Sequence, residues 1–312
     1  MTALNPAAHG IPESEDLIPT AKAPKVRKST EGSIAVRKKS VWATIIAAVI
    51  AILWTIPTIG LLITSFRPQI EVLKSGWWTV WQNPVFTLDN YKEALTGGTT
   101  NLSSFFLNSF IITIPAVIIP ISIACLTAYG FAWVNFKLAP VLFVAVFALQ
   151  IVPIQVTLIP LLKLFVNAGL AGTFWPIWIA HSIFALPLAV YLLHNFMSEL
   201  PKELFEAARV DGAGHLTIFF KILLPLMLPA IAAFAIFQFL WVWNDLLVGL
   251  TFGASPEVAP LTVRIAELSG TRGSAWHLLS AGAFISMVVP LIVFVSMQRY
   301  FVRGLLAGSV KG

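Results

Sequence analysis

The chain has 312 residues, of which 58% are hydrophobic and only 11% are Asp, Glu, Lys or Arg. Soluble globular proteins carry about a quarter charged residues, so this composition excludes an ordinary water-soluble protein. The single cysteine, Cys125, lies in an apolar run and excludes both a disulfide framework and a cysteine-rich metal site.

Six apolar runs are long enough to form helices that cross a membrane. A bilayer core about 30 Å thick needs roughly 20 mostly apolar residues of helix, since every backbone polar group must be satisfied within the helix. The runs cover about residues 41–66, 105–133, 140–162, 174–193, 229–251 and 278–301. We therefore predict an all-α membrane protein with six transmembrane helices.

The positive charges predict the orientation of these helices. Of the 20 Lys and Arg residues, 14 fall in the N-terminal segment, the loops after the second and fourth runs, and the C-terminal tail. The other side of the membrane would carry 6. Cytoplasmic loops are enriched in Lys and Arg, so both termini are predicted to be cytoplasmic.

The two ends of the chain differ from the apolar middle. Residues 1–40 are rich in Pro, Ser, Glu and Lys without apolar periodicity, which predicts a disordered, basic cytoplasmic arm. Residues 41–304 are expected to form the transmembrane domain and residues 305–312 a cytoplasmic tail. The run 41–66 is too long for the apolar region of a signal peptide, so it is interpreted as an uncleaved first helix.

Two outer loops are large enough to have structure of their own. The loop of residues 67–104 contains the sequence DNYKEAL at 89–95, which predicts a short surface helix. The loop of residues 252–277 is long for a link between two spans. Each loop is either a docking surface or a solvated connector.

The loop between the fourth and fifth runs, residues 194–228, contains a predicted short helix. Ser198 is a possible N-cap, Pro201 falls in the first turn, and the helix would end at about Val210. Asp211-Gly212 then breaks the helix, because glycine adopts a positive φ that other residues adopt only with strain.

Apolar residues recur at helical spacing on both sides of that break. Leu204, Phe205 and Ala208 are expected on one side of the first helix. After the break the repeat continues with Ile218, Phe219, Ile222, Leu223 and Leu226. The pattern predicts a helix–turn–helix that lies at the membrane surface, either against lipid or docked into a partner protein.

The same loop carries a recognisable motif. Glu206-Ala207-Ala208, Asp211-Gly212-Ala213, Ile222 and Leu224-Pro225 together resemble the EAA loop of permease subunits in bacterial binding-protein-dependent ABC importers. Four further segments resemble the carbohydrate-importing branch of these permeases, and within it the maltose-type MalG family. They are Asn108-Ser109-Phe110, Ala128-Tyr129-Gly130-Phe131-Ala132, Trp243-Asn244-Asp245 and the terminal residues 304–312. The basic residue usual soon after span two comes later here, at Lys137.

This resemblance implies a type I ABC importer permease fold in the bacterial cytoplasmic (inner) membrane. It implies that the short helix ending at Gly212 is a coupling helix on a cytoplasmic ATPase dimer, which Glu206 and the C-terminal tail would contact. The residues implied in ATPase coupling are Glu206, Ala207, Ala208, Asp211, Gly212, Ala213 and Pro225. The other implied partners are a second, MalF-like permease and an extracytoplasmic sugar-binding protein, which the loop between spans five and six would touch.

The sequence has no machinery for ATP hydrolysis or other catalysis. It lacks the G-x-x-x-x-G-K-[ST] phosphate loop, and its five scattered histidines do not have metal-ligand spacing. The chain is therefore predicted not to be an enzyme and to bind no cofactor, with ATP and Mg on the partner ATPase. Nucleic acid is not an expected partner.

A few polar residues within the predicted spans are candidates for a translocation pathway. They are Gln150, Gln155, Gln238, Asn244 and Asp245. Asp245 is the only carboxylate in a span, and such residues normally face a cavity or a partner. It either lines the pathway or makes a structural hydrogen bond at a helix end. Gln238 and Asp245 are seven residues apart and would share a helix face.

His181 lies inside the fourth span and is interpreted as a packing residue rather than a ligand. The predicted function is ATP-driven import of a sugar, expected to be a di- or oligosaccharide, by alternating access. One alternative is an ion-coupled secondary transporter, which would need ionisable residues in several spans. The other is a membrane assembly protein without a transport role.

Overall fold

The computed structural model describes residues 41–97, 101–134, 136–270, 273 and 275–307. The regular elements within these residues are all helical. The predicted arm of residues 1–40 and the last five residues of the predicted tail lie outside the described residues. The chain divides into two units, Met1–Leu53 and Trp54–Gly312, and the division falls within the first helix.

Five helices are long and apolar enough to cross a membrane, or six if one bent pair is counted as a single span. The five are α1 (Val41–Phe66), α4 (Leu102–Trp133), α7 (Trp175–Ser198), α10 (Leu224–Trp243, which the preceding short helices extend back to His215) and α13 (Trp276–Ala307). Helix therefore makes up most of each of the six predicted runs, with interruptions in the third and the fifth. Because α13 continues to Ala307, the predicted tail begins within a helix.

The third run, predicted as one transmembrane helix over residues 140–162, is broken by a bend. It consists of α5 (Ala139–Ala148) with the 3-10 turn η2 (Leu149–Ile151), followed by α6 (Ile154–Asn167) at a bend of 100°. Pro153 stands immediately before α6, and Val152 before it is extended. A proline lacks an N–H and disfavours the helical conformation of the preceding residue, which explains the break.

The fifth run is also interrupted. Helix α10 ends at Trp243, and a separate short helix, α11 (Leu247–Phe252), follows it. The prediction of a continuous helix over 229–251 is wrong, and Gln238 and Asp245 consequently do not share a helix face.

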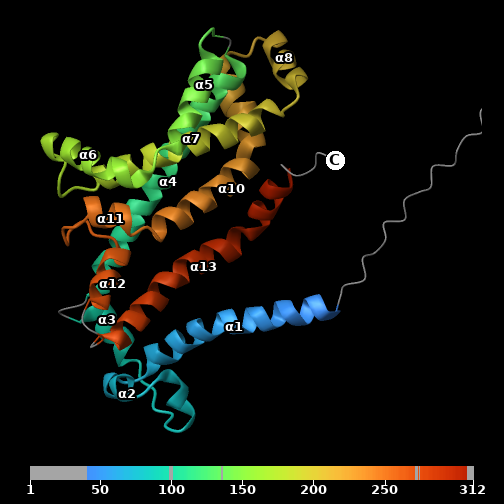
Figure 1. Cartoon of the computed structure of the whole chain (residues 1–312). Coiled ribbons are helices and arrows are strands. Elements are labelled where there is room, and N and C mark those ends of the chain that lie inside the picture. The colour runs from blue at the N-terminus through green and yellow to red at the C-terminus, as the bar shows by residue number, and fades with distance from the viewer. Residues whose placement is uncertain (1–40, 98–100, 135, 271–272, 274, 308–312) are drawn as a thin grey trace, which may run out of the picture. The chain divides into compact units, whose positions relative to one another are not determined.

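Helix α4 lies at the centre of the unit Trp54–Gly312 and packs most extensively against α7 (Figure 1). Three buried clusters follow one another along it. Near its start, Leu102 packs with residues of α3 and α13. In its middle, Ile112 and Ala116 pack with α6, α7 and α11. Near its end, Tyr129 packs with the end of α7 and with the loop of residues 194–228.

Both outer loops contain helices. The first contains α2 (Gln69–Lys74), the 3-10 helix η1 (Trp77–Trp81) and α3 (Asp89–Thr96). The predicted surface helix at 89–95 is confirmed: Asp89, Lys92, Glu93 and Thr96 are exposed, while Asn90 and Ala94 are buried where α3 packs against α4 and α13. The second loop contains α12 (Leu261–Ser269), a helix that was not predicted.

Candidate functional site

The loop of residues 194–228 lies at one end of the unit, and α3 and α12 lie toward the other (Figure 1). It contains α8 (Lys202–Val210), α9 (His215–Ile218) and a π-helical turn, η3 (Phe219–Leu223), that runs into α10. The predicted N-cap is wrong: Ser198 is the last residue of α7, and its hydroxyl donates to the carbonyl of His194. Pro201 precedes α8 directly, as an N-terminal proline can.

The predicted break after α8 is confirmed. Gly212 has a φ of +82°. The Gly212 N–H donates to the carbonyl of Arg209 at 3.0 Å, and the Ala213 N–H donates to that of Ala208 at 2.9 Å. These two bonds form the Schellman motif, in which a glycine in the left-handed region closes the end of a helix. The backbone alone therefore fixes the turn.

Helix α8 has one buried and one exposed face. Phe205 and Ala208 are buried, whereas Leu204, which precedes Ala208 by one helical turn on the same side, is 45% exposed at the edge of the buried face. Opposite the buried pair lie Glu203, Glu206, Ala207 and Val210, which we call the outward face of α8; all four are exposed, Val210 by 88%.

Six of the seven predicted coupling residues come together on α8 and its closing turn. Of these, Ala208 is buried and Ala213 half-buried, and the remaining four are exposed: Glu206, Ala207, Asp211 and Gly212. Pro225 lies elsewhere, in the first turn of α10 beyond the π-helical turn. It cannot donate to the carbonyl of Lys221, and the helix widens just before it.

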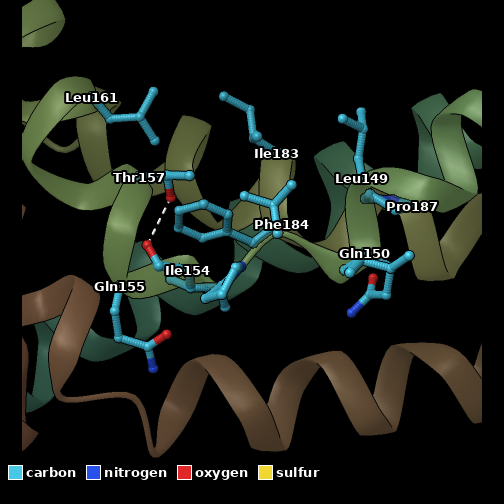
Figure 2. Close-up of a pocket in the computed structure, with 12 residues that line it drawn as sticks. Leu149, Gln150, Ile154, Gln155, Thr157, Leu161, Ile183, Phe184 and Pro187 are labelled. Carbon is cyan, nitrogen blue, oxygen red and sulfur yellow. Dashed lines mark hydrogen bonds between the residues drawn. The ribbon is translucent and has the colours of Figure 1, made fainter.

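The predicted pathway residues divide into separate groups. Gln150 and Gln155 flank the break between η2 and α6 and line a cavity of about 440 Å³ together with Phe184 of α7. Figure 2 shows both amide side chains pointing to the same side of the break, while the Thr157 hydroxyl bonds back to the carbonyl of Ile154 at 2.7 Å.

The other three candidates do not line this cavity. Gln238 is buried, and its amide donates to the carbonyl of Ala116 on α4 at 3.1 Å. Asn244 borders a second cavity, of about 520 Å³, that α12 and α13 also line. Its amide donates to the carbonyl of Leu240 at 2.7 Å.

Asp245 holds the break between α10 and α11. Its Oδ2 accepts the N–H groups of Val248 at 2.9 Å and Gly249 at 3.1 Å, the first turn of α11. Its carbonyl accepts the Thr262 hydroxyl of α12 at 2.6 Å. Of the two roles left open by the sequence, this geometry corresponds to the structural hydrogen bond at a helix end.

His181 packs beside that break. It is 1% exposed, its Nε2 is 3.9 Å from Oδ2 of Asp245, and its ring meets Trp241 edge-on at 5.2 Å. The contacts agree with the predicted packing role. Within the described part of the chain, His, Cys, Asp and Glu do not form any group of three or more that could hold a metal ion.

Asn108 and Ser109, for which the sequence predicts no role of their own, connect the second outer loop to α4. The Asn108 amide donates to the carbonyls of Glu257 at 3.0 Å and Ala259 at 3.1 Å. The Ser109 hydroxyl accepts the N–H of Leu261 at 2.9 Å. The motif Asn108-Ser109-Phe110 was the available signal, but its partners are some 150 residues away in the chain.

Comparison with known proteins gives consistent matches. Residues 95–306 match the family model described as "Binding-protein-dependent transport system inner membrane component". The osmoprotective compounds uptake permease protein GgtD of Synechocystis is 51% identical over 92% of this chain and 98% of its own length. The alpha-glucoside transport system permease protein AglG of Rhizobium meliloti is 53% identical over 73% of this chain and 61% of its own length.

A similar fold is found among solved structures. A chain from a bacterial ABC transporter involved in the import of the acidic polysaccharide alginate aligns with a TM-score of 0.68 at 20% identity. The alignment covers 85% of this chain and 98% of that chain. The likeness extends over the whole permease domain and shows the fold of an importer permease.

Proposed function

Because the chain belongs to the family of inner membrane components of binding-protein-dependent transport systems, we propose that it moves a sugar across the bacterial inner membrane. The sugar would be a di- or oligosaccharide. In this proposal a separate ATPase dimer hydrolyses ATP, a second permease completes the pathway, and an extracytoplasmic binding protein delivers the solute. The alpha-glucoside permease AglG, at 53% identity, supports a sugar substrate.

The observation that carries the proposal is that α8 has one buried face and one exposed face. Phe205 and Ala208 fix the helix to the rest of the protein, while Glu206, Ala207 and Val210 stay exposed on the outward face. A helix that is rigidly mounted on one side and exposed on the other can take a push from a partner and pass it on. We infer that this face binds the ATPase, with Glu206 and Ala207 at its centre.

The break in the third span supports a solute pathway. Gln150 and Gln155 bring two amides to one side of a largely apolar cavity that also contains the Phe184 ring. Sugar sites combine polar groups for the hydroxyls with apolar surface for the ring faces. In the proposed mechanism, ATP binding closes the ATPase dimer, and this closure moves the two permeases from the inward-facing to the outward-facing state. ATP hydrolysis then returns them to the inward-facing state.

The proposed orientation has both termini and α8 in the cytoplasm. The distribution of Lys and Arg supports it. The folded outer loops with α3 and α12 then face the binding protein, at the end of the unit away from α8 (Figure 1).

Reconstitution tests the proposal against its rivals. The chain, its second permease and the ATPase would be placed in proteoliposomes, and uptake of labelled maltose or another α-glucoside measured with the binding protein. We expect uptake that needs ATP and every subunit and that an ionophore does not abolish. Uptake without the ATPase would instead identify a secondary transporter. Absence of sugar-stimulated ATP turnover with a full set of cognate subunits would identify an assembly protein.

The pathway residues have their own test. Gln150→Leu combined with Gln155→Leu is expected to raise the KM for the sugar several-fold while leaving ATPase binding unchanged, because two hydroxyl partners are lost. Gln298→Leu is the matched control: it removes an exposed amide on α13 whose bond goes to Val295 in the same helix. Equal KM values in all three proteins would show that the cavity is not part of the pathway.

A further inference from the structure

The cytoplasmic-side end of α4 contacts both short helices of the coupling loop (residues 194–228). Tyr129 and Trp133 are four residues apart on α4 and therefore lie on the same face. The Trp133 ring lies 4.0 Å from the Phe205 ring of α8. The Tyr129 hydroxyl lies 2.8 Å from Nδ1 of His215, the first residue of α9. One helix thus contacts α8 and α9 on either side of the Gly212 turn.

The two contacts differ in kind. The Phe205 side chain is 2% exposed, and its contact with Trp133 is an apolar contact between two rings without a hydrogen bond from the indole N–H. The Tyr129–His215 contact is a hydrogen bond, which weakens steeply when donor and acceptor are misaligned. Only the second contact fixes an orientation.

The hydrogen bond sits at the boundary between a buried ring and solvent. Tyr129 is 8% exposed, and its ring also packs edge-on against Phe219 at 5.4 Å. His215 is exposed. A phenylalanine could fill the ring space, so what tyrosine adds at this position is its hydroxyl. Within the described part of the chain, this is the one side-chain hydrogen bond between residues 202–215 and a membrane span.

Helix α4 continues from this contact to the outer side. It has 32 residues, which is about 48 Å of helix at 1.5 Å per residue. Near its other end, Asn108 and Ser109 hold residues 257–261 of the second outer loop. A rotation of α8 that also rotates α4 would therefore move the second outer loop at the other end of α4. This requires that the contact between α4 and the coupling loop keep its geometry during the rotation.

We propose that the Tyr129–His215 pair is the positioning contact that locks the coupling loop to α4, so that motion of the ATPase drives the span instead of being absorbed at the Gly212 turn. In this proposal the pair acts through α4 and is not part of the surface that binds the ATPase or the sugar. This inference rests on the proposed function, since it requires that α8 receive motion from an ATPase.

The test uses the complete reconstituted transporter and measures sugar moved per ATP hydrolysed. Tyr129→Phe and His215→Ala each remove one partner of the bond. Each is expected to lower that ratio about threefold to fivefold, while ATP turnover and co-purification of the ATPase stay at the wild-type level. The double variant is expected to be no worse than either single variant, because both remove the same contact. His215→Asn, which keeps a polar group near the place of Nδ1, is expected to restore most of the ratio.

Thr127→Val is the matched control, because it removes a hydroxyl of a half-buried residue two positions away on α4 that bonds within its own helix, to the carbonyl of Ile123. It should leave the ratio unchanged. An unchanged ratio in Tyr129→Phe, or a double variant whose loss is the product of the two single losses, would overturn the inference. So would uptake and ATP turnover that fall in proportion, which marks a merely structural role. Failure of the proposed function itself is distinguishable, because the wild-type complex would then show no ATP-driven uptake.

Discussion

Two helix breaks in this protein are closed in opposite ways. At Gly212, backbone N–H groups close the end of α8, and the side chains of its outward face stay exposed. At Asp245, a mostly buried carboxylate opens α11, with the His181 ring beside it. A turn that the backbone makes leaves side chains available for a partner, whereas a turn made by a side chain commits that residue to the fold. The first break should therefore respond to substitution in function and the second in stability.

The strongest test of the comparison removes the cap at the second break. Asp245→Ala leaves the buried N–H groups of Val248 and Gly249 without their acceptor, and each buried donor left unsatisfied costs about 1–3 kcal/mol of unfolding free energy. Thermal unfolding of the purified protein in detergent measures it. Asn244→Ala is the neighbouring control, since that amide is exposed and bonds within α10. Equal destabilisation by both variants would contradict the capping role.

The next effect comes from crowding behind the same break. A Cβ at Gly249 would lie 2.8 Å from Cγ of Pro260 and 3.1 Å from Cγ2 of Val263, so Gly249→Ala forces α11 away from α12. Overpacking of this kind costs roughly 1–3 kcal/mol, again measured by thermal unfolding. Gly130→Ala, on α4 with open space around it, should be neutral or slightly stabilising. Equal unfolding temperatures of the two alanine variants would contradict the close packing of α11 on α12.

A smaller cost is expected at the first break. A Cβ at Gly212 meets open space, so Gly212→Ala is opposed only by the positive φ of 82°. That conformation costs an alanine about 1–2 kcal/mol, and part of the cost can be avoided by fraying the end of α8. Gly212→Asn should lose less, since asparagine visits this region more readily. Unfolding and co-purification of the ATPase are both measured; asparagine behaving worse than alanine would show that space, not conformation, sets the requirement.

The sequence predicted the spans and the Gly212 turn well because both are local. Apolar runs of sufficient length and a glycine after a short helix depend on few distant partners. The sequence-based prediction was wrong where contacts between distant residues determine the structure. The cap formed by Asp245 depends on α10 ending at Trp243, which a uniformly apolar run does not reveal. The start of α12 is held by hydrogen bonds to Asn108 and Ser109, which lie about 150 residues earlier in the chain.

The candidate site was predictable only as a set of residues. The motif placed Glu206 through Ala213 together correctly, but a short periodic pattern cannot decide which face is buried. Leu204 looked equivalent to Phe205 in the sequence, yet Phe205 is buried against the Trp133 ring whereas Leu204 is 45% exposed. Gln238 looked like a pathway residue because glutamine in a span is unusual, but its amide is used between helices.

The last prediction concerns the outward face itself, where the effect on stability should be smallest and the effect on function large. Val210 is 88% exposed, so Val210→Lys should change the unfolding free energy by less than about 0.5 kcal/mol. It places a charge in the surface proposed to bind the ATPase, and co-purification of that subunit is expected to fall sharply. Leu216→Lys is the control, because Leu216 is 74% exposed on α9, outside the outward face of α8. Since both variants add the same charge to an exposed apolar position of one loop, equal loss of the ATPase would mean that general charge, and not the outward face of α8, governs binding.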